Sequence, residues 1–339
     1  MYIYVKKMRA AVNTKYGLPE VVKVTQAEKP VPKDNEVLIK VYATTVNRTD
    51  SGFRSAEYFV SRFFSGLLKP KNKILGNEFA GVIQAVGRDV KNFSVGDEVF
   101  GYNDKNFGAH AEYMTMDANG AIAPKPANLS FEEAAPIAEG AHYALCDIRA
   151  VNVQEGQNVM VYGATGAIGS AAVQLLKYFG AKVTAVCATR HLDLVKALGA
   201  DSVIDYTKED FTKTYQTFDF IFDAVGKSSF GQCKPLLKTR GTYISTELGQ
   251  NAENIFLALL TSFWGGRKVL FPIPSINRDD LLFLKELVIS GKYKPVIDRQ
   301  YRLEQIVEAY HYVESGQKVG NVVITLEQND CPLFASGSL

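Results

Sequence analysis

A glycine-rich turn constrains the fold of this chain more than any other sequence feature. In the segment VMVYGATGAIGSAAVQLLKYFGAKV, Gly163, Gly166 and Gly169 recur at every third residue between an apolar strand and a long helix. Glycines let the backbone turn tightly and approach a pyrophosphate, and the N-terminus of the next helix supplies unpaired N–H groups and a favourable dipole. A second apolar strand follows in the order that a dinucleotide-binding fold requires. We therefore expect cofactor contacts from Gly163, Thr165, Gly166, Ala167, Ile168 and Gly169; the alternative is a turn that serves only helix–strand packing.

The end of the second strand indicates which dinucleotide binds. An NAD site usually carries Asp or Glu here, because the carboxylate binds the ribose 2′-hydroxyl. This chain has VCATRH instead, with no acid before Asp193. Thr189 and Arg190 fall at a helix start, where the helix dipole disfavours a cation unless an anion lies nearby. A 2′-phosphate is such an anion, so the pattern favours NADPH. A capping Thr189 and a solvated Arg190 are the plain alternative.

Strand-like and helical segments alternate after the glycine turn but not before it. From Asn158 onward this alternation predicts a doubly wound parallel sheet, an α/β fold. The part before about residue 125 has short strands separated by Pro, Gly, Asn and Asp, which is typical of a β-rich barrel or sandwich. Two amphipathic helices follow Arg278, and we expect the strand Asn321–Leu326 to return to the first domain. Other expected strands are Glu36–Ala43, Phe79–Val86, Glu98–Gly101, Val159–Tyr162, Lys182–Cys187, Val203–Asp205, Phe218–Asp223, Gly241–Ser245 and Val269–Phe271, and helices are expected to begin at Phe131 (with Ser130 and Glu133 as a capping box), Ala167 and Thr189.

Length and composition limit the classes of protein to which the chain can belong. Its 339 residues are too many for one ordinary hydrophobic core and suit two domains. The 38 basic and 36 acidic residues give a net charge of +2, which provides no general attraction to nucleic acid or to an anionic membrane. Because no apolar run approaches the roughly 20 residues that span a bilayer, we expect no stable membrane insertion. The N-terminus lacks a signal-peptide core and the cysteines are scattered, so we expect a cytoplasmic protein, with a removed transit peptide left open.

Several segments resemble the medium-chain dehydrogenase/reductase family along nearly the whole chain. They are MRAAVNTKYGLPEVVKV, LGNEFAGVIQAVGRDVKNFSVGDEVFG, VYGATGAIGSAAVQLLK and GQKVGNVVITLE. The match favours the zinc-free branch of zeta-crystallin-like quinone oxidoreductases and alkenal or enoyl reductases. This resemblance implies a GroES-like β-rich catalytic domain, residues 1–125 and 276–339, around a Rossmann NADPH-binding domain, residues 126–275. It also implies an active site in the cleft between the domains and a homodimer formed through an edge strand such as Lys268–Phe271.

Amides occupy the positions of the family's zinc ligands. Where zinc-dependent members have Cys-Arg-Thr-Asp, this chain has Asn47-Arg48-Thr49-Asp50, and where they have Gly-His-Glu it has Gly76-Asn77-Glu78. Neutral amides are poor substitutes for thiolate and imidazole at a zinc centre. The four-cysteine structural zinc lobe of the family is missing from the sequence, and the histidines stand at isolated positions. We therefore expect no bound metal.

The resemblance also implies catalytic residues. Asn47 and Asp50 match the Asn-x-x-Asp pattern of the zinc-free members. In this interpretation Asn47 donates to the substrate oxygen or to the nicotinamide ribose, and Asp50 organises the loop or a proton path. The alternative for Asp50 is a plain helix cap. Tyr58 is the candidate tyrosine proton donor. The remaining cofactor contacts that the family implies are Tyr206, Val225, Gly226 and Asn321.

Together these features predict an NADPH-dependent oxidoreductase that transfers hydride, without zinc, to a quinone or an α,β-unsaturated carbonyl. Such an acceptor spreads the incoming charge over conjugated oxygen, so the protein needs mainly positioning, a dry cleft and hydrogen bonds to that oxygen. The expected partner is a small lipophilic carbonyl or quinone. One alternative is a trans-2-enoyl thioester reductase, with Lys69, Lys71 and Lys73 as a patch for a carrier phosphate. A non-enzymatic alternative is an NADPH-binding sensor or a structural protein of the lens-crystallin kind.

Overall fold

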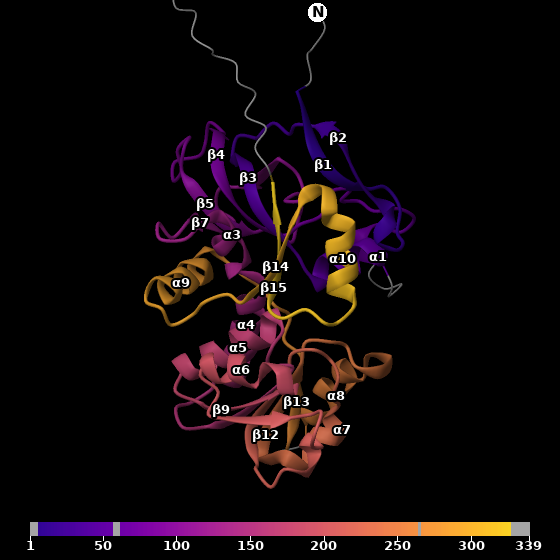
Figure 1. The fold of residues 1–339 in the computed structure, drawn as a ribbon, viewed down its shortest axis with the longest axis vertical. Helices are drawn as coiled ribbons and strands as arrows, with labels where there is room; N and C mark the ends of the chain where they lie inside the picture. The colour runs from indigo at the N-terminus through magenta and orange to yellow at the C-terminus, as the bar shows by residue number, and fades with distance from the viewer. Residues whose placement is uncertain (1–5, 57–61, 264–265, 327–339) are drawn as a thin grey trace, which may run out of the picture.

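Two separate β-sheets and a two-stranded hairpin organise the chain. The computed structural model describes residues 6–56, 62–263 and 266–326. In Figure 1 the mainly antiparallel sheet occupies the upper end of the molecule and the parallel sheet the lower end, with α4 (Glu139–Val151) near the middle. The yellow C-terminal strands lie beside the indigo strand β3, so segments from both ends of the sequence build the upper sheet.

The parallel sheet has the strand order β10-β9-β8-β11-β12-β13, and every adjacent pair is parallel. This order confirms the predicted doubly wound α/β fold, in which ligands bind beyond the carboxyl ends of the strands where the winding reverses. Here the reversal lies between β8 and β11. The strand bounds are Asn158–Tyr162 (β8), Lys182–Cys187 (β9), Ser202–Asp205 (β10), Phe218–Asp223 (β11), Leu237–Ser245 (β12) and Lys268–Leu270 (β13).

The antiparallel sheet has the order β14-β15-β3-β4-β5-β7, with β6 paired to β3. Its strands are Glu36–Val46 (β3), Glu78–Val86 (β4), Glu98–Tyr102 (β5), Tyr113–Asp117 (β6), Ile122–Pro124 (β7), Ile297–Arg302 (β14) and Asn321–Thr325 (β15), and the hairpin consists of Lys7–Asn13 (β1) and Val22–Glu28 (β2). Strand β15 pairs antiparallel with β3, which confirms the predicted return of the last strand. The sequence analysis missed β14, because its residues IDRQYR are mostly polar and lie at a sheet edge.

The helices are short, and several differ in extent from the prediction. The helix expected at Phe131 is one turn of α-helix, and it carries the predicted capping box: Glu133 N–H donates to Ser130 Oγ at 3.2 Å. Among the described residues, no helix has both the length and the apolar character needed to cross a membrane. The α-helices are Arg48–Ser55 (α1), Arg62–Ser65 (α2), Phe131–Ala134 (α3), Glu139–Val151 (α4), Ala167–Tyr178 (α5), Leu192–Ala197 (α6), Phe230–Cys233 (α7), Glu253–Thr261 (α8), Arg278–Ile289 (α9) and Ile306–Glu314 (α10). Short 3₁₀ turns occupy Pro19–Val21, Ala135–Ile137, Thr189–His191, Phe211–Lys213, Lys234–Leu236, Gln250–Ala252 and Leu303–Gln305.

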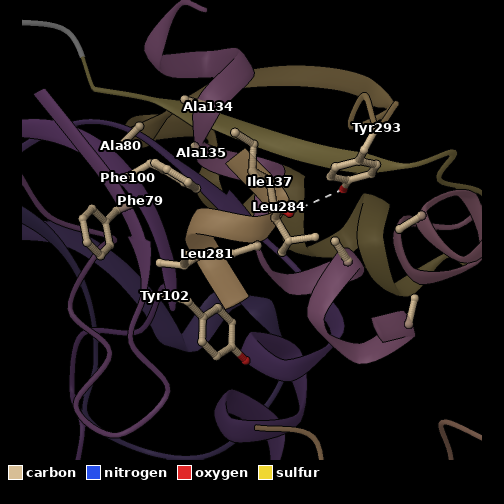
Figure 2. Close-up of a cluster of buried hydrophobic side chains, with 14 of the residues drawn as sticks. Phe79, Ala80, Phe100, Tyr102, Ala134, Ala135, Ile137, Leu281, Leu284 and Tyr293 are labelled. Carbon is tan, nitrogen blue, oxygen red and sulfur yellow. Dashed lines mark hydrogen bonds between the residues drawn. The ribbon is translucent and has the colours of Figure 1, made fainter. Parts of the chain in front are cut away.

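One hydrophobic core joins the antiparallel sheet to helices from later in the chain. Figure 2 shows side chains of β4 and β5 facing those of the α3–α4 junction and of α9. The labelled members are Phe79, Ala80, Phe100, Tyr102, Ala134, Ala135, Ile137, Leu281, Leu284 and Tyr293. The Tyr293 hydroxyl donates to the Ile137 carbonyl at 3.4 Å, so the polar end of this buried ring is satisfied. This packing fixes the start of α4 against the antiparallel sheet.

The central role of this core predicts a large loss of stability on truncation of Phe79. Its side chain is 0% exposed, and Phe→Ala changes in cores cost about 3–5 kcal/mol through lost burial and a residual cavity. Val31→Ala is the control, because Val31 is 83% exposed and such surface changes stay within about 0.5 kcal/mol. Denaturant unfolding followed by circular dichroism measures both variants. Equal midpoints for the two variants would contradict this description of the core.

Candidate active site

The glycine turn links β8 to α5 at the switch point of the parallel sheet. A Cβ on Gly169 would lie 2.1 Å from Gly163 O, and one on Gly163 would lie 2.5 Å from Val225 Cγ1. Packing therefore requires glycine at both positions. Gly166 is different, because its added Cβ would meet only Gly163 O, at an ordinary 3.8 Å. Its open backbone precedes the first turn of α5, whose N–H groups lack intrahelical partners. This combination fits the pyrophosphate of a dinucleotide and is not explained by packing alone.

The loop after β11 lies beside the glycine turn and is held by Asp223. The buried Asp223 carboxylate accepts hydrogen bonds from the N–H groups of Val225 (3.0 Å), Gly226 (2.8 Å) and Ser228 (2.7 Å). Val225 in turn contacts Gly163. Two of the predicted cofactor regions, the glycine turn and the Val225–Gly226 loop, are thus adjacent. The sequence analysis missed Asp223, although an acid at the carboxyl end of an apolar strand was the available signal.

The predicted 2′-phosphate region contains an acid that the sequence analysis missed. Asp205 ends β10, and its carboxylate accepts a hydrogen bond from Thr189 Oγ1 at 2.5 Å and one from Thr207 N–H at 3.0 Å. These hydrogen bonds lower the pKa of Asp205 to about 2, so it is ionised at neutral pH. The Thr189 hydroxyl therefore binds a protein carboxylate here. Arg190 is exposed and donates from Nε to His191, and Tyr206 is 52% exposed.

Two further glycines bring other parts of the chain against the glycine turn. A Cβ on Gly140, in α4, would lie 2.6 Å from Ala167 O. Gly320, which precedes β15, donates its N–H to Thr165 O at 2.7 Å. The turn is therefore contacted from α4 on one side and from the antiparallel sheet on the other. The next residue, Asn321, is 5% exposed and donates from Nδ2 to Val296 O at 3.0 Å, so its side chain is anchored to the backbone.

A buried polar cluster lies one residue from the Gly140 contact. Asn47 Nδ2 donates to Asn77 Oδ1 at 2.7 Å and also to Glu139 Oε2. Thr49 Oγ1 lies 2.7 Å from Glu139 Oε1. Asn47, Asn77 and Glu139 are each at most 8% exposed. The amides at the family's zinc-ligand positions are thus hydrogen-bonded to each other and to a carboxyl group from α4.

Asp50 forms a helix cap and is fully buried. Asn47 Oδ1 accepts from Asp50 N–H at 2.9 Å while Asp50 Oδ2 accepts from Asn47 N–H at 3.2 Å, a reciprocal capping box at the start of α1. Asp50 Oδ1 also accepts from Gly76 N–H at 2.9 Å. Burial raises the pKa of Asp50 to about 7. His110 Nε2 lies 3.7 Å from Asp50, but burial lowers the pKa of that imidazole to about 4, so the contact is not an ion pair at neutral pH.

Glu78 and Glu139 are neighbouring buried carboxyl groups with unequal hydrogen bonding. Glu78 accepts from the N–H groups of Ala138 (3.1 Å) and Glu139 (2.6 Å) and from Thr45 Oγ1 (2.7 Å). Burial raises the pKa of Glu78 to about 7 despite these donors. The pKa of Glu139 is raised well above its usual range, by burial first and by the nearby Glu78 and Asp50 carboxyls second. Because Glu78 has the backbone donors, we assign the proton to Glu139.

Two ionisable groups beside this cluster were also missed by the sequence analysis. Tyr143 follows Glu139 by one turn of α4, and burial raises the pKa of its hydroxyl. Lys318 Nζ donates to Gly320 O at 2.7 Å, and burial lowers the pKa of Lys318 to about 8. The isolated acid in the apolar run PIAEGAHYAL was the available signal for Glu139. The predicted proton donor, Tyr58, lies outside the described residues.

The donor set of this region is that of a hydrogen-bonded network. Across the described part of the chain, no group of three or more His, Cys, Asp and Glu side chains is arranged to hold a metal ion. Asn47 and Asn77 supply neutral amides, which bind zinc weakly.

Family models match two parts of the chain. Residues 33–127 match the alcohol dehydrogenase GroES-like domain, and residues 198–324 match the zinc-binding dehydrogenase domain. A quinone oxidoreductase from Coxiella burnetii has the same fold, with a TM-score of 0.86, 28% identity, and coverage of 95% of this chain and 100% of that one. These matches confirm the predicted pairing of a GroES-like domain with a Rossmann-type parallel sheet.

Curated relatives match almost the whole chain. The tomato (Solanum lycopersicum) 2-methylene-furan-3-one reductase is 33% identical over 94% of this chain and 79% of its own length. An Arabidopsis thaliana protein named NADPH-dependent alkenal/one oxidoreductase is 30% identical over 94% of this chain and 80% of its own length. A spinach (Spinacia oleracea) quinone-oxidoreductase homolog is 30% identical over 94% and 98%. The chain therefore belongs to the medium-chain dehydrogenase/reductase family of oxidoreductases, in the branch of quinone oxidoreductases and alkenal reductases.

Proposed function

We propose that this chain is an NADPH-dependent reductase that transfers a hydride to a quinone or an α,β-unsaturated carbonyl without zinc. The observation that carries the proposal is that three parts of the chain contact the glycine turn. They are the loop held by Asp223, helix α4 through Gly140, and the segment entering the antiparallel sheet through Gly320. The same contacts bring the start of α4, with the buried Asn47–Glu139 cluster, to the glycine turn, which supports a single site for cofactor and substrate. The names of the relatives, which are reductases of alkenals, enones and quinones, support the reaction class.

The cofactor proposal assigns different parts of the dinucleotide to different residues. The open backbone at Gly166 and the first turn of α5, Ala167 to Gly169, suit the pyrophosphate. Val225 and Gly226 suit the nicotinamide ribose. When bound, the reduced nicotinamide supplies a hydride. Arg190 and the exposed ring of Tyr206 suit the 2′-phosphate. Asp205 is a nearby negative charge that repels a phosphate, so the attraction to Arg190 must exceed this repulsion.

The roles proposed for Asn47 and Asp50 follow from their contacts. Both N–H bonds of the Asn47 amide point at acceptors in the cluster, so Asn47 acts by holding Asn77 and Glu139 in place. Asp50 is 0% exposed and caps α1, so it acts by fixing the Asn47 corner. Tyr58, which lies outside the described residues, stays a candidate catalytic residue. The substrate itself is proposed to be small and lipophilic, since no metal is needed to stabilise charge on a conjugated oxygen.

Assembly, location and domain limits are also proposals. We propose a homodimer through the edge strand β13, whose neighbour α8 exposes apolar side chains such as Phe256 (61%) and Leu259 (62%). We propose a cytoplasmic protein whose GroES-like part is 1–125 with 276–339 and whose Rossmann part is 126–275. A trans-2-enoyl thioester reductase is the second candidate, because Lys69, Lys71 and Lys73 are all exposed near one another in the chain.

A panel of acceptors tests the proposed reaction. Purified protein is mixed with NADPH, or with NADH as a control, and with benzoquinone, phenanthrenequinone, an alkenal or crotonyl-CoA, and nicotinamide absorbance is followed. We expect NADPH oxidation with a quinone or the alkenal. Preference for crotonyl-CoA would favour the thioester reductase. Binding of NADPH with no turnover of any acceptor would favour a sensor or structural protein, and failure to bind either nucleotide would contradict the cofactor site.

Arg190 tests the choice of NADPH. A charge-assisted hydrogen bond to phosphate is worth about 1.5–3 kcal/mol, so Arg190→Ala is expected to weaken NADPH binding roughly 10–100-fold and leave NADH binding nearly unchanged. Arg88→Ala is the matched control, because this exposed arginine pairs with Asp34 far from the glycine turn in the sequence. Fluorescence titration gives both dissociation constants. If Arg190→Ala weakened the binding of NADPH and of NADH equally, Arg190 would not be a ligand of the 2′-phosphate.

Metal removal tests the proposal that zinc is not used. We expect dialysis against a strong chelator to leave turnover unchanged and added zinc not to raise it, because amides stand at the ligand positions. Elemental analysis of the dialysed protein accompanies the assay. Loss of turnover on chelation with recovery on zinc addition would overturn the proposal.

A further inference from the structure

One carboxyl group and two hydroxyl groups, those of Glu139, Thr49 and Tyr143, form a line that begins in the buried cluster and ends at the half-buried Tyr143 side chain. Glu139 and Tyr143 are four residues apart on α4 and so share one helix face. Thr49, in the first turn of α1, faces both side chains: its Oγ1 donates to Glu139 Oε1 at 2.7 Å, and it lies beside the Tyr143 hydroxyl. Glu139 is 6% exposed, whereas Thr49 and Tyr143 are half-buried. The line therefore leads from the interior outward.

The hydrogen bonds of Glu139 indicate which of its oxygens carries the proton. Oε2 accepts from the Asn47 amide, which can only donate there. When Glu139 is protonated, the direction of the Thr49–Glu139 hydrogen bond reverses: the proton lies on Oε1 and points at Thr49 Oγ1. The hydroxyl of Thr49 can accept this proton and donate its own. Glu78 binds the proton less strongly than Glu139, because the backbone N–H groups of Ala138 and Glu139 stabilise the ionised form of Glu78.

The Tyr143 end of this line faces the cofactor loops. Glu247, which follows β12, packs against the loop after β11: a Cβ on Gly226 would lie 2.4 Å from Glu247 Cγ. Arg48 in α1 also pairs with Glu247 at 3.7 Å. Gly140, between Glu139 and Tyr143 in the sequence, packs on Ala167 at the start of α5. The outer end of the line thus lies among segments to which the dinucleotide is assigned.

We propose that Tyr143 protonates the reduced substrate and that the buried Glu139 carboxyl group then supplies a replacement proton to Tyr143 through Thr49. The inference rests on the proposed function. Tyr143 is then a catalytic residue, and Thr49 and Glu139 are positioning residues that act through it. Other charged or ionisable groups face Glu139 from neighbouring elements: Glu78 on β4, Asp50 on α1, Tyr102 on β5 and Lys318 before β15.

The proton and electron balance is simple for an enone or a quinone. The substrate accepts two electrons as a hydride from the reduced nicotinamide dinucleotide, and negative charge develops on its conjugated oxygen. The Tyr143 O–H bond breaks as a new O–H bond forms on that oxygen. Thr49 passes its hydroxyl proton to Tyr143 and takes the proton of Glu139 Oε1, which leaves Glu139 as a carboxylate. A proton from water restores Glu139 after the product leaves.

The first test needs no turnover. Infrared spectra of the apoprotein at neutral pH are recorded for the wild type, Glu139→Gln and the surface control Glu155→Gln, in water and in deuterium oxide. We expect the wild type and Glu155→Gln to share a deuterium-sensitive component of the carboxylic acid absorption, beside any from Asp50 and Glu78, that Glu139→Gln lacks. An unchanged carboxylic acid band in Glu139→Gln would show that Glu139 is ionised and would overturn the proposal.

The second test separates a hydroxyl relay from a packing role. We expect Thr49→Val and Tyr143→Phe to lower kcat roughly 10²–10⁴-fold, the usual contribution of acid–base catalysis, with little change in the dissociation constant for NADPH. Thr49→Ser, which keeps the hydroxyl, should recover at least a tenfold part of the turnover lost in Thr49→Val. Equal turnover in the Val and Ser variants would overturn the relay.

These results distinguish failure of the inference from failure of the proposed function. One case is a wild type that reduces an acceptor while the infrared band is unchanged in Glu139→Gln, or while Thr49→Val and Thr49→Ser turn over equally. Either result would show that the relay alone is wrong. If the wild type reduces no acceptor, the proposed function fails, and the proton-delivery role fails with it even where the infrared band is present. NADPH titration of every variant checks that the folded cofactor site is intact.

Discussion

The close contact of the glycine turn with Gly140 and Gly320 is the constraint on which the rest of the structure depends. The turn is built from the parallel sheet, but the residues that contact it come from α4 and from the segment that enters the antiparallel sheet. At Gly140 a side chain would collide with the Ala167 backbone, so α4 lies too close to the start of α5 for any residue but glycine at this position. Because α4 begins at Glu139, this contact also sets the position of the buried carboxyl cluster relative to the cofactor region.

The cluster is costly to form, and its hydrogen bonds show how the cost is limited. Moving an ionised carboxylate out of water costs several kcal/mol of desolvation free energy unless the carboxylate is paired or hydrogen-bonded. Glu78 obtains backbone donors at the start of α4, and Asp50 obtains those of Asn47 and Gly76. Glu139 has only side-chain partners and lies beside two other acids, so protonation is its least costly state. A neutral acid next to a hydroxyl is suited to supply a proton.

The sequence predicted the elements whose signal is local. Glycines at every third residue between a strand and a helix predicted the turn, and the alternation after Asn158 predicted the parallel sheet, because both patterns follow from backbone geometry. The return of Asn321–Leu326 to the first domain was also predicted, and β15 pairs with β3. Strand β14 was missed because its polar, edge-exposed residues give no alternation. The helix expected from Thr189 to Gly199 is a 3₁₀ turn followed by a shorter α6.

The site was less predictable, because its interactions join residues far apart in the sequence. Asn47 was identified, but its partner Glu139 lies 92 residues away and only the fold brings them together. Asp205 was missed for the same reason: it lies 16 residues from Thr189 but accepts a hydrogen bond from the Thr189 hydroxyl, at the place where the sequence analysis expected a 2′-phosphate. Asp50 matched a family pattern, and the structure shows that it caps α1 and also accepts a hydrogen bond from Gly76 N–H.

A crystal structure of the chain with NADPH bound is the most direct test of the central claim, that the glycine contacts assemble one reductase site. The account predicts the pyrophosphate at the N–H groups of Gly166 to Gly169 and the 2′-phosphate against Arg190. It also predicts the nicotinamide on the side of Val225 and Gly226 that faces Thr49 and Tyr143. A dinucleotide bound elsewhere, or a nicotinamide directed away from α4, would contradict it.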